Sequence, residues 1–96
     1  MELEVQGIRS PEGKGFSIGR VNRVLSVLVD NRVSHVSAVV RAAGVLRAHG
    51  LYIDFDLCLG PDSIAAFQAY DAWGNLSSRV LTLVCSAGVL SEAYVS

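Results

Sequence analysis

Two aspartates, Asp54 and Asp56, have the residue type and the spacing that acid–base chemistry uses. They interrupt residues 51–59, in which every odd-numbered residue is apolar. This alternation predicts a strand, and both carboxylates would then project from its other face. Paired carboxylates can exchange protons with a substrate or bind Ca²⁺, but the first role needs a pocket that tunes their pKa values and the second needs more oxygen ligands. Nothing in the sequence places such groups together, so we interpret the pair as the solvated side of a strand.

The remaining nucleophiles and metal-binding side chains do not have the spacing of a site either. His35 and His49 have no cysteine near them, which is not the spacing of a zinc site. Cys58 and Cys85 lie in apolar runs, where a thiol usually packs as a small hydrophobic group. No Gly-x-Ser-x-Gly elbow is present. We therefore expect no enzymatic activity, no catalytic residue, no metal and no cofactor.

Three aromatic residues, Tyr52, Tyr70 and Trp73, could stack on the apolar faces of a sugar. The alternative is that the same rings pack along the edge of a sheet. Carbohydrate binding is therefore kept as one possible function.

A Gly-rich stretch at residues 10–19 contains Gly13, Gly15 and Gly19. The spacing is G-x-G-x-x-x-G, and the Gly-Lys-Ser/Thr of a phosphate-binding loop is missing. We expect a mobile loop or arm that becomes ordered on a partner.

The elements that would position these residues centre on a hairpin. Along residues 65–70, Ala65, Phe67 and Ala69 would share one face of a strand. Gly74 can adopt positive φ and reverse the chain, while the side chain of Asp71 can bind backbone N–H groups of the corner. Residues 80–85 are β-branched or apolar and would form the return strand.

The same hairpin carries a family resemblance. The order Phe67-x-Ala69-x-Asp71-x-x-Gly74-Asn75-x-Ser77 resembles the F–G corner of fibronectin type III and bacterial or phage immunoglobulin-like modules. The likeness covers about residues 57–85. It implies an immunoglobulin-like β-sandwich, although no tryptophan stands in the expected second strand.

The other apolar stretches are predicted as further strands. They span residues 2–8, 20–29, 33–42 and 51–59, with Asp30-Asn31 as a turn and a short tail at residues 86–96 that could add a strand. Residues 38–48 suit a helix as well as a strand. We expect a single domain over residues 1–96, all-β, with an antiparallel sandwich architecture. The alternative is an α+β fold with a helix at about residues 62–73, capped by Asp62 and ended by Gly74.

The charge is unevenly distributed along the chain. The net charge is −1 overall, but residues 1–50 hold seven basic and four acidic residues, and residues 51–96 hold one basic and five acidic residues. A near-neutral chain does not indicate nucleic-acid binding. Six basic residues, which we call the basic set, are predicted to bind an acidic partner, and this partner could be another copy of the chain. The basic set comprises Lys14, Arg20, Arg23, Arg32, Arg41 and Arg47. The alternative is a solvated basic face.

The composition predicts exposed apolar surface. Hydrophobic residues make up 51% of the chain and charged residues only 18%, against about a quarter charged in an average domain. A small domain has much surface for its volume, so some apolar side chains should lie outside the core and form an interface. Glu2 and Glu4 stand where a signal peptide would be basic, and no apolar run of about 18 residues predicts a membrane span.

These observations lead to one functional hypothesis and one alternative. The hypothesis is a non-catalytic structural subunit of a larger assembly, most concretely an accessory or decoration protein of a phage virion that is assembled in the host cytoplasm. Its partners would be capsid or tail subunits or further copies of the chain. The alternative is a module that binds carbohydrate or a cell-surface partner.

Overall fold

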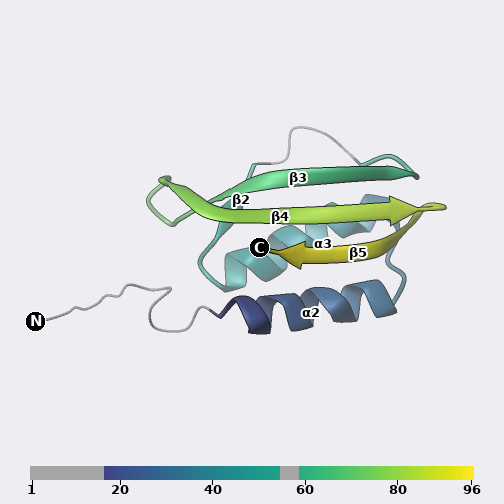
Figure 1. The fold of residues 1–96 in the computed structure, drawn as a ribbon, viewed down its shortest axis with the longest axis horizontal. Helices are drawn as coiled ribbons and strands as arrows, with labels where there is room; N and C mark the ends of the chain where they lie inside the picture. Colours follow the sequence, from purple (N-terminus) through teal and green to yellow (C-terminus); the bar gives the residue numbers. More distant parts are fainter. Residues whose placement is uncertain (1–16, 55–58) are drawn as a thin grey trace, which may run out of the picture.

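In the part of the chain that the structure describes, two helices pack on one antiparallel sheet. The computed structural model describes residues 17–54 and 59–96. The elements run in the order α2 (Ile18–Asp30), α3 (His35–Ala48), β2 (Tyr52–Ile53), β3 (Ser63–Tyr70), β4 (Leu76–Ser86) and β5 (Val89–Val95). The four strands form a curled sheet in the order β2-β3-β4-β5, with α3 behind it and α2 alongside β5 (Figure 1). The chain is therefore α+β, and the predicted immunoglobulin-like β-sandwich is wrong.

The first predicted strand that is wrong is residues 20–29, which form most of α2. Val21, Leu25 and Leu28 are buried and recur at the three- and four-residue spacing of one helix face. The valines between them suggested a strand, but Val24 and Val27 lie on the exposed side of the helix. Ser17 caps the helix, because its hydroxyl accepts a hydrogen bond from the Arg20 amide at 3.4 Å.

The prediction of a strand at residues 33–42 is wrong for the same reason, because the buried residues there also repeat with a helical period. Ala38, Ala42 and Leu46 are fully buried at successive four-residue steps of α3. Ser34 caps this helix by accepting a hydrogen bond from the Ser37 amide at 3.2 Å. Residues 38–48, for which strand and helix were both open, are helical. Of the predicted loop at 10–19, Ile18 and Gly19 already belong to α2.

The predicted hairpin is confirmed, and the helix proposed for residues 62–73 is wrong. β3 and β4 pair antiparallel, with Ala65 opposite Leu83 and Phe67 opposite Leu81. Gly74 has φ of 82° at the corner, as its reversal required. Local turn chemistry and period-two alternation therefore decide this segment against the helical preference of its alanines.

The C-terminal tail forms the fourth strand. β5 pairs with β4 after a two-residue turn in which Ala87 and Gly88 both have positive φ, the conformation of a tight hairpin turn whose twist matches that of the strands. Of the strand predicted at residues 51–59, the structure has β2, which pairs with the end of β3. The strand at 2–8 and residues 55–58 lie outside the described residues.

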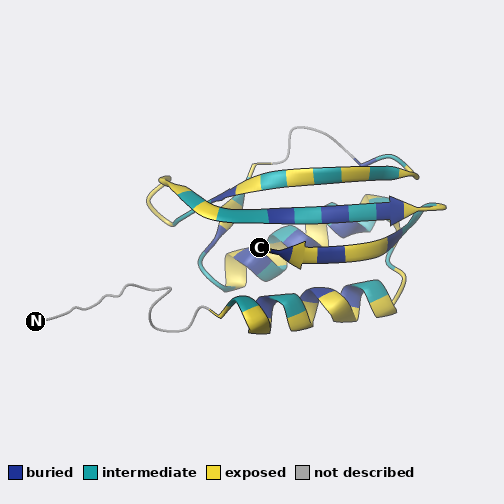
Figure 2. Ribbon diagram, viewed as in Figure 1, coloured by how far each residue is buried: buried dark blue, intermediate teal, exposed yellow. Residues whose placement is uncertain are grey.

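The core lies between the helices and one face of the sheet. Two rows of cross-strand partners lie on this covered face, Ala65 with Leu83 and Ala93, and Phe67 with Leu81 and Val95. Buried positions alternate with more exposed ones along β4 and β5 (Figure 2). The largest fully buried side chains are Leu25, Leu46, Leu81, Leu83, Leu90, Val21 and Val95. Phe67 packs against this core and is partly buried.

The turn between the helices is fastened to the end of the sheet. The Leu90 amide donates to the Val33 carbonyl at 2.8 Å, and the His35 amide donates to the Gly88 carbonyl at 2.9 Å. These bonds fix where α3 starts, so the helix runs back across the covered face from the β4–β5 turn.

Asn22 binds α2 to the outer edge of β5. Its side-chain Oδ1 accepts a hydrogen bond from the Val95 amide at 2.6 Å, and its Nδ2 donates to the Val95 carbonyl at 3.0 Å. The carboxamide therefore replaces the peptide unit of a neighbouring strand, because it offers the same donor and acceptor. This contact satisfies backbone groups that an edge strand would otherwise present to other chains.

Replacing Asn22 with Ala should destabilise the domain by about 1–3 kcal/mol, because it leaves two partly buried backbone groups of Val95 without partners. Asn31→Ala is the matched control, since the Asn31 carboxamide is exposed and donates only to the Val27 carbonyl of its own helix. Urea unfolding of both variants measures the difference. Equal losses of stability in the two variants would show that Asn22 does not seal the edge.

Candidate interaction surface

The predicted basic residues lie on the helices and the turn between them. Arg20 and Arg23 are exposed on α2, Arg41 and Arg47 are exposed on α3, and Arg32 lies in the turn between the helices. Lys14 lies outside the described residues. The structure therefore gathers five of the six predicted basic residues in one layer of the molecule.

The two layers carry opposite charge. The helix layer, residues 17–50 of the described chain, holds these five arginines and one acidic residue, Asp30. Its net charge is therefore +4. The sheet layer, residues 51–54 and 59–96, holds four acidic residues and one arginine, a net charge of −3. The charge asymmetry of the sequence thus becomes an asymmetry between two sides of a small domain.

No element in residues 17–54 and 59–96 covers the side of the sheet away from the helices, and this side is largely apolar. Cross-strand pairing places its residues in three rows: Ile64, Val84 and Glu92; Ala66, Thr82 and Tyr94; Gln68 and Val80. We call these eight residues the open face. Ile64 is 78% exposed and Tyr94 is 41% exposed. A solvated face of an antiparallel sheet is normally polar, so this run of apolar side chains is unusual.

A shallow hollow of about 520 Å³ lies at one end of the open face. Ile64 and Val84 supply its apolar wall, and Asp62 stands at its rim. The Asp62 side chain is held in place, because its Oδ1 accepts a hydrogen bond from the Ala87 amide at 2.9 Å. The hollow therefore combines an apolar surface with a fixed negative charge.

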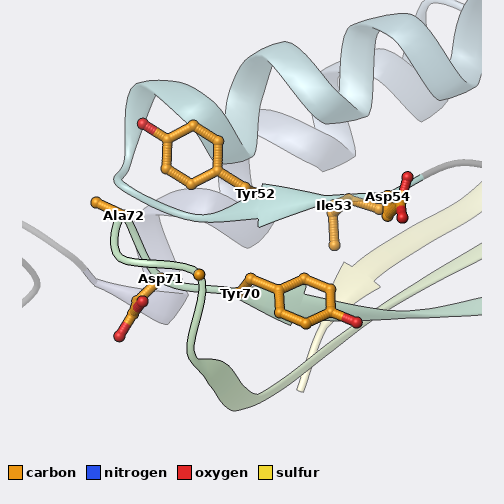
Figure 3. Close-up of a pocket in the computed structure, with 7 residues that line it drawn as sticks. Tyr52, Ile53, Asp54, Tyr70, Asp71 and Ala72 are labelled. Carbon is orange, nitrogen blue, oxygen red and sulfur yellow. The ribbon is translucent and has the colours of Figure 1, made fainter.

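A second recess, of about 460 Å³, lies beside β2 and the corner between β3 and β4 (Figure 3). Tyr52, Tyr70 and Asp54 line it, and the tyrosines are paired across the strands. Their rings nevertheless point in opposite directions (Figure 3), and Trp73 is not part of the lining. The three aromatic residues therefore do not form one flat platform for a sugar.

The carboxylate of Asp71 is committed to the corner itself. Its Oδ1 accepts hydrogen bonds from the Trp73 and Asn75 amides, each at 2.9 Å, and its Oδ2 accepts one from the Asn75 side chain at 3.3 Å. The hydrogen bond from the Asn75 amide is the main cause that lowers the pKa of Asp71, because these donors favour the charged form. This is the corner-fixing role that the sequence predicted for Asp71.

The other candidate chemical groups are bound to backbone or buried. His35 and His49 each place Nδ1 near a backbone carbonyl, of Gly88 at 3.3 Å and of Val45 at 2.9 Å. Cys85 is buried, and desolvation raises the pKa of its thiol. Cys58 and Asp56 lie outside the described residues. Within the described ranges, no three His, Cys, Asp or Glu side chains gather as a metal site.

No helix in residues 17–54 and 59–96 is long and apolar enough to cross a membrane. No family model, curated protein or solved structure matches the chain. The likeness of residues 57–85 to immunoglobulin-like modules stays a prediction from sequence.

The open face is the feature that the sequence reasoning missed. Even-numbered residues of β3 and β4 include Ile64, Val80 and Val84, while odd-numbered residues such as Phe67, Leu81 and Leu83 are apolar as well. Strands that are apolar on both sides indicate either a sheet covered on both faces or an interface. That signal was present in the sequence, but only the register of the strands shows which residues share a face.

The stability that the Asp71 carboxylate contributes should depend on pH, and the variant Asp71→Asn measures this dependence. A lowered pKa in the folded state means that the charged carboxylate adds stability at neutral pH, and this contribution is lost as pH falls through that pKa. The asparagine keeps an acceptor oxygen but has no charge. The parent should therefore exceed the variant in urea midpoint at pH about 7, and the gap should shrink below pH about 4, the ordinary value for Asp. A gap that is constant with pH would contradict the role of the charge.

Proposed function

We propose that this chain is a non-catalytic subunit of a larger protein assembly, and that the open face of the sheet contacts a neighbouring protein. The observation that carries the proposal is Ile64, which is 78% exposed in a row with Val84 and beside a hollow. Burying one large aliphatic side chain contributes about 1.5–3 kcal/mol. A face that keeps Ile64 and the ring of Tyr94 in water gains free energy when a partner covers these side chains.

The charges around this surface support a protein partner with a defined orientation. Asp62 and Glu92 lie at the hollow and on the open face, while the arginines lie on the helix layer. Charged groups around an apolar centre steer association and select the partner, and the apolar centre supplies most of the affinity. The predicted basic set thus acts in this proposal as one of two charged surfaces.

The finer proposal is that the assembly is a phage particle, in which the chain is an accessory or decoration protein bound to capsid or tail subunits. Its support is compositional: the charged content is only 18%, and seven of the eight basic residues are arginine, the cation suited to ion pairs at interfaces. The analogy with phage immunoglobulin-like modules does not support this proposal, because the described residues form an α+β fold.

The proposal is tested by following the tagged full chain and its Ile64→Asp variant through density-gradient sedimentation of extracts from its source. The parent should sediment with a large assembly, and the variant should shift to the position of the free chain, because a carboxylate on the open face must be desolvated on binding. Ala72→Asp is the control, since Ala72 is exposed in the corner away from the open face.

Circular dichroism of the purified variants establishes that all three chains are folded alike. A parent that sediments as the free chain, or an Ile64→Asp variant that stays with the assembly, would contradict the proposal.

A further inference from the structure

The helix layer and the sheet layer of this domain carry opposite net charge, so the helix layer of one copy could bind the sheet layer of another. We propose that the partner on the open face is a second copy of this chain, bound head to tail through the outer side of α3. This inference rests on the proposed function and names the partner of the same surface. The open face of one copy would cover Val40 of the next, with Val36 at the margin of the contact.

The outer side of α3 is a second apolar surface, and none of the described residues covers it. Val36 is 71% exposed and Val40 is 72% exposed, one turn apart on the helix. Gly44 continues the stripe, and a side chain built there would meet nothing within 4 Å. Arg47, exposed in the last turn, lies on the same stripe. We call Val36, Val40, Gly44 and Arg47 the helix stripe.

The helix stripe and the open face point in opposite directions. Ala38, Ala42 and Leu46 turn the inner side of α3 towards the core, and α3 lies behind the sheet (Figure 1). Each copy therefore presents one apolar surface at the front and a different one at the back. Contact between unlike surfaces is heterologous, and it continues from copy to copy as a ring or a filament.

The charges select this arrangement over the two symmetric ones. A contact between two open faces would bring Glu92 and Asp62 of one copy towards the same acidic residues of the other. A contact between two helix layers would bring arginines together. Stacking a layer of net charge +4 on a layer of net charge −3 brings opposite charges together instead.

The spacing of residues along the helix stripe also matches the spacing of residues across the open face. Val40 and Arg47 are seven residues apart on α3, which is about 10 Å along a helix axis. Ile64 and Glu92 lie in one row across β3, β4 and β5, which is two strand spacings, or about 10 Å. With Val40 placed over Ile64, Arg47 reaches Glu92. The helix of one copy then lies across the strands of the next.

Mixing two blocked variants tests the head-to-tail contact directly. Val40→Asp blocks the helix stripe and leaves the open face intact, and Ile64→Asp does the reverse. In sedimentation equilibrium the parent should form species larger than a dimer as concentration rises, while each variant alone should remain monomeric. The two variants mixed should form a one-to-one dimer, because together they have one intact pair of surfaces. Ala72→Asp should associate like the parent.

A charge exchange tests the pairing of residues. Arg47→Glu and Glu92→Arg should each weaken self-association about tenfold or more, and the double variant should recover most of the loss. Failure of the double variant to recover, or association of either blocked variant alone, would overturn the head-to-tail contact.

The two proposals fail in different ways. A purified parent chain that stays monomeric at every concentration, while the chain in extracts still sediments with an assembly through Ile64, would overturn self-association and retain the proposed function. A chain that is free in extracts as well would overturn both.

Discussion

Two helices cover one face of this sheet, and no described element covers the other. Leu81 and Leu83 of β4 reach the core on the covered face, where they meet the buried sides of α2 and α3. The helices cannot also cover Ile64 and Val84, because these side chains project from the opposite side of the same strands. The division into a covered and an open face therefore follows from the alternation of side chains.

The same two-layer arrangement leads from fold to function. The helix half of the sequence is basic and the sheet half is acidic, so the layers inherit opposite charges. Asn22 occupies the backbone N–H and C=O of Val95 at the edge of β5, so these groups are not available for pairing with another strand. The outer side of α3 and the open face of the sheet are then the two apolar surfaces whose charges fit each other.

The part of the fold that the sequence predicted correctly depends on local interactions. The β3–β4 hairpin was predicted because Gly74 and Asp71 fix its corner within a few residues. The helices were missed because exposed valines such as Val36 and Val40 have the preference of strand residues. Val21, Leu25 and Leu28 have a helical period and serines cap both helices, but the sequence analysis did not use these signals.

The candidate site was predicted only in part. The basic set can be counted along the sequence, whereas the open face brings together residues that are far apart in the sequence. The basic set is a count along the chain, and the structure gathers its described members in the helix layer. The open face depends on the register between β3, β4 and β5, which joins residues as far apart as Ile64 and Glu92. No spacing along the sequence states that register.

Methyl NMR of the full chain on dilution tests the central claim most directly, because it reports which side chains leave an interface when copies separate. If copies associate through the open face and the helix stripe, shift changes should be concentrated at Ile64 and Val84 on the sheet and at Val36 and Val40 on α3, while Val27 on α2 should stay unchanged. Shifts that do not depend on concentration, or that change on only one of the two surfaces, would contradict it.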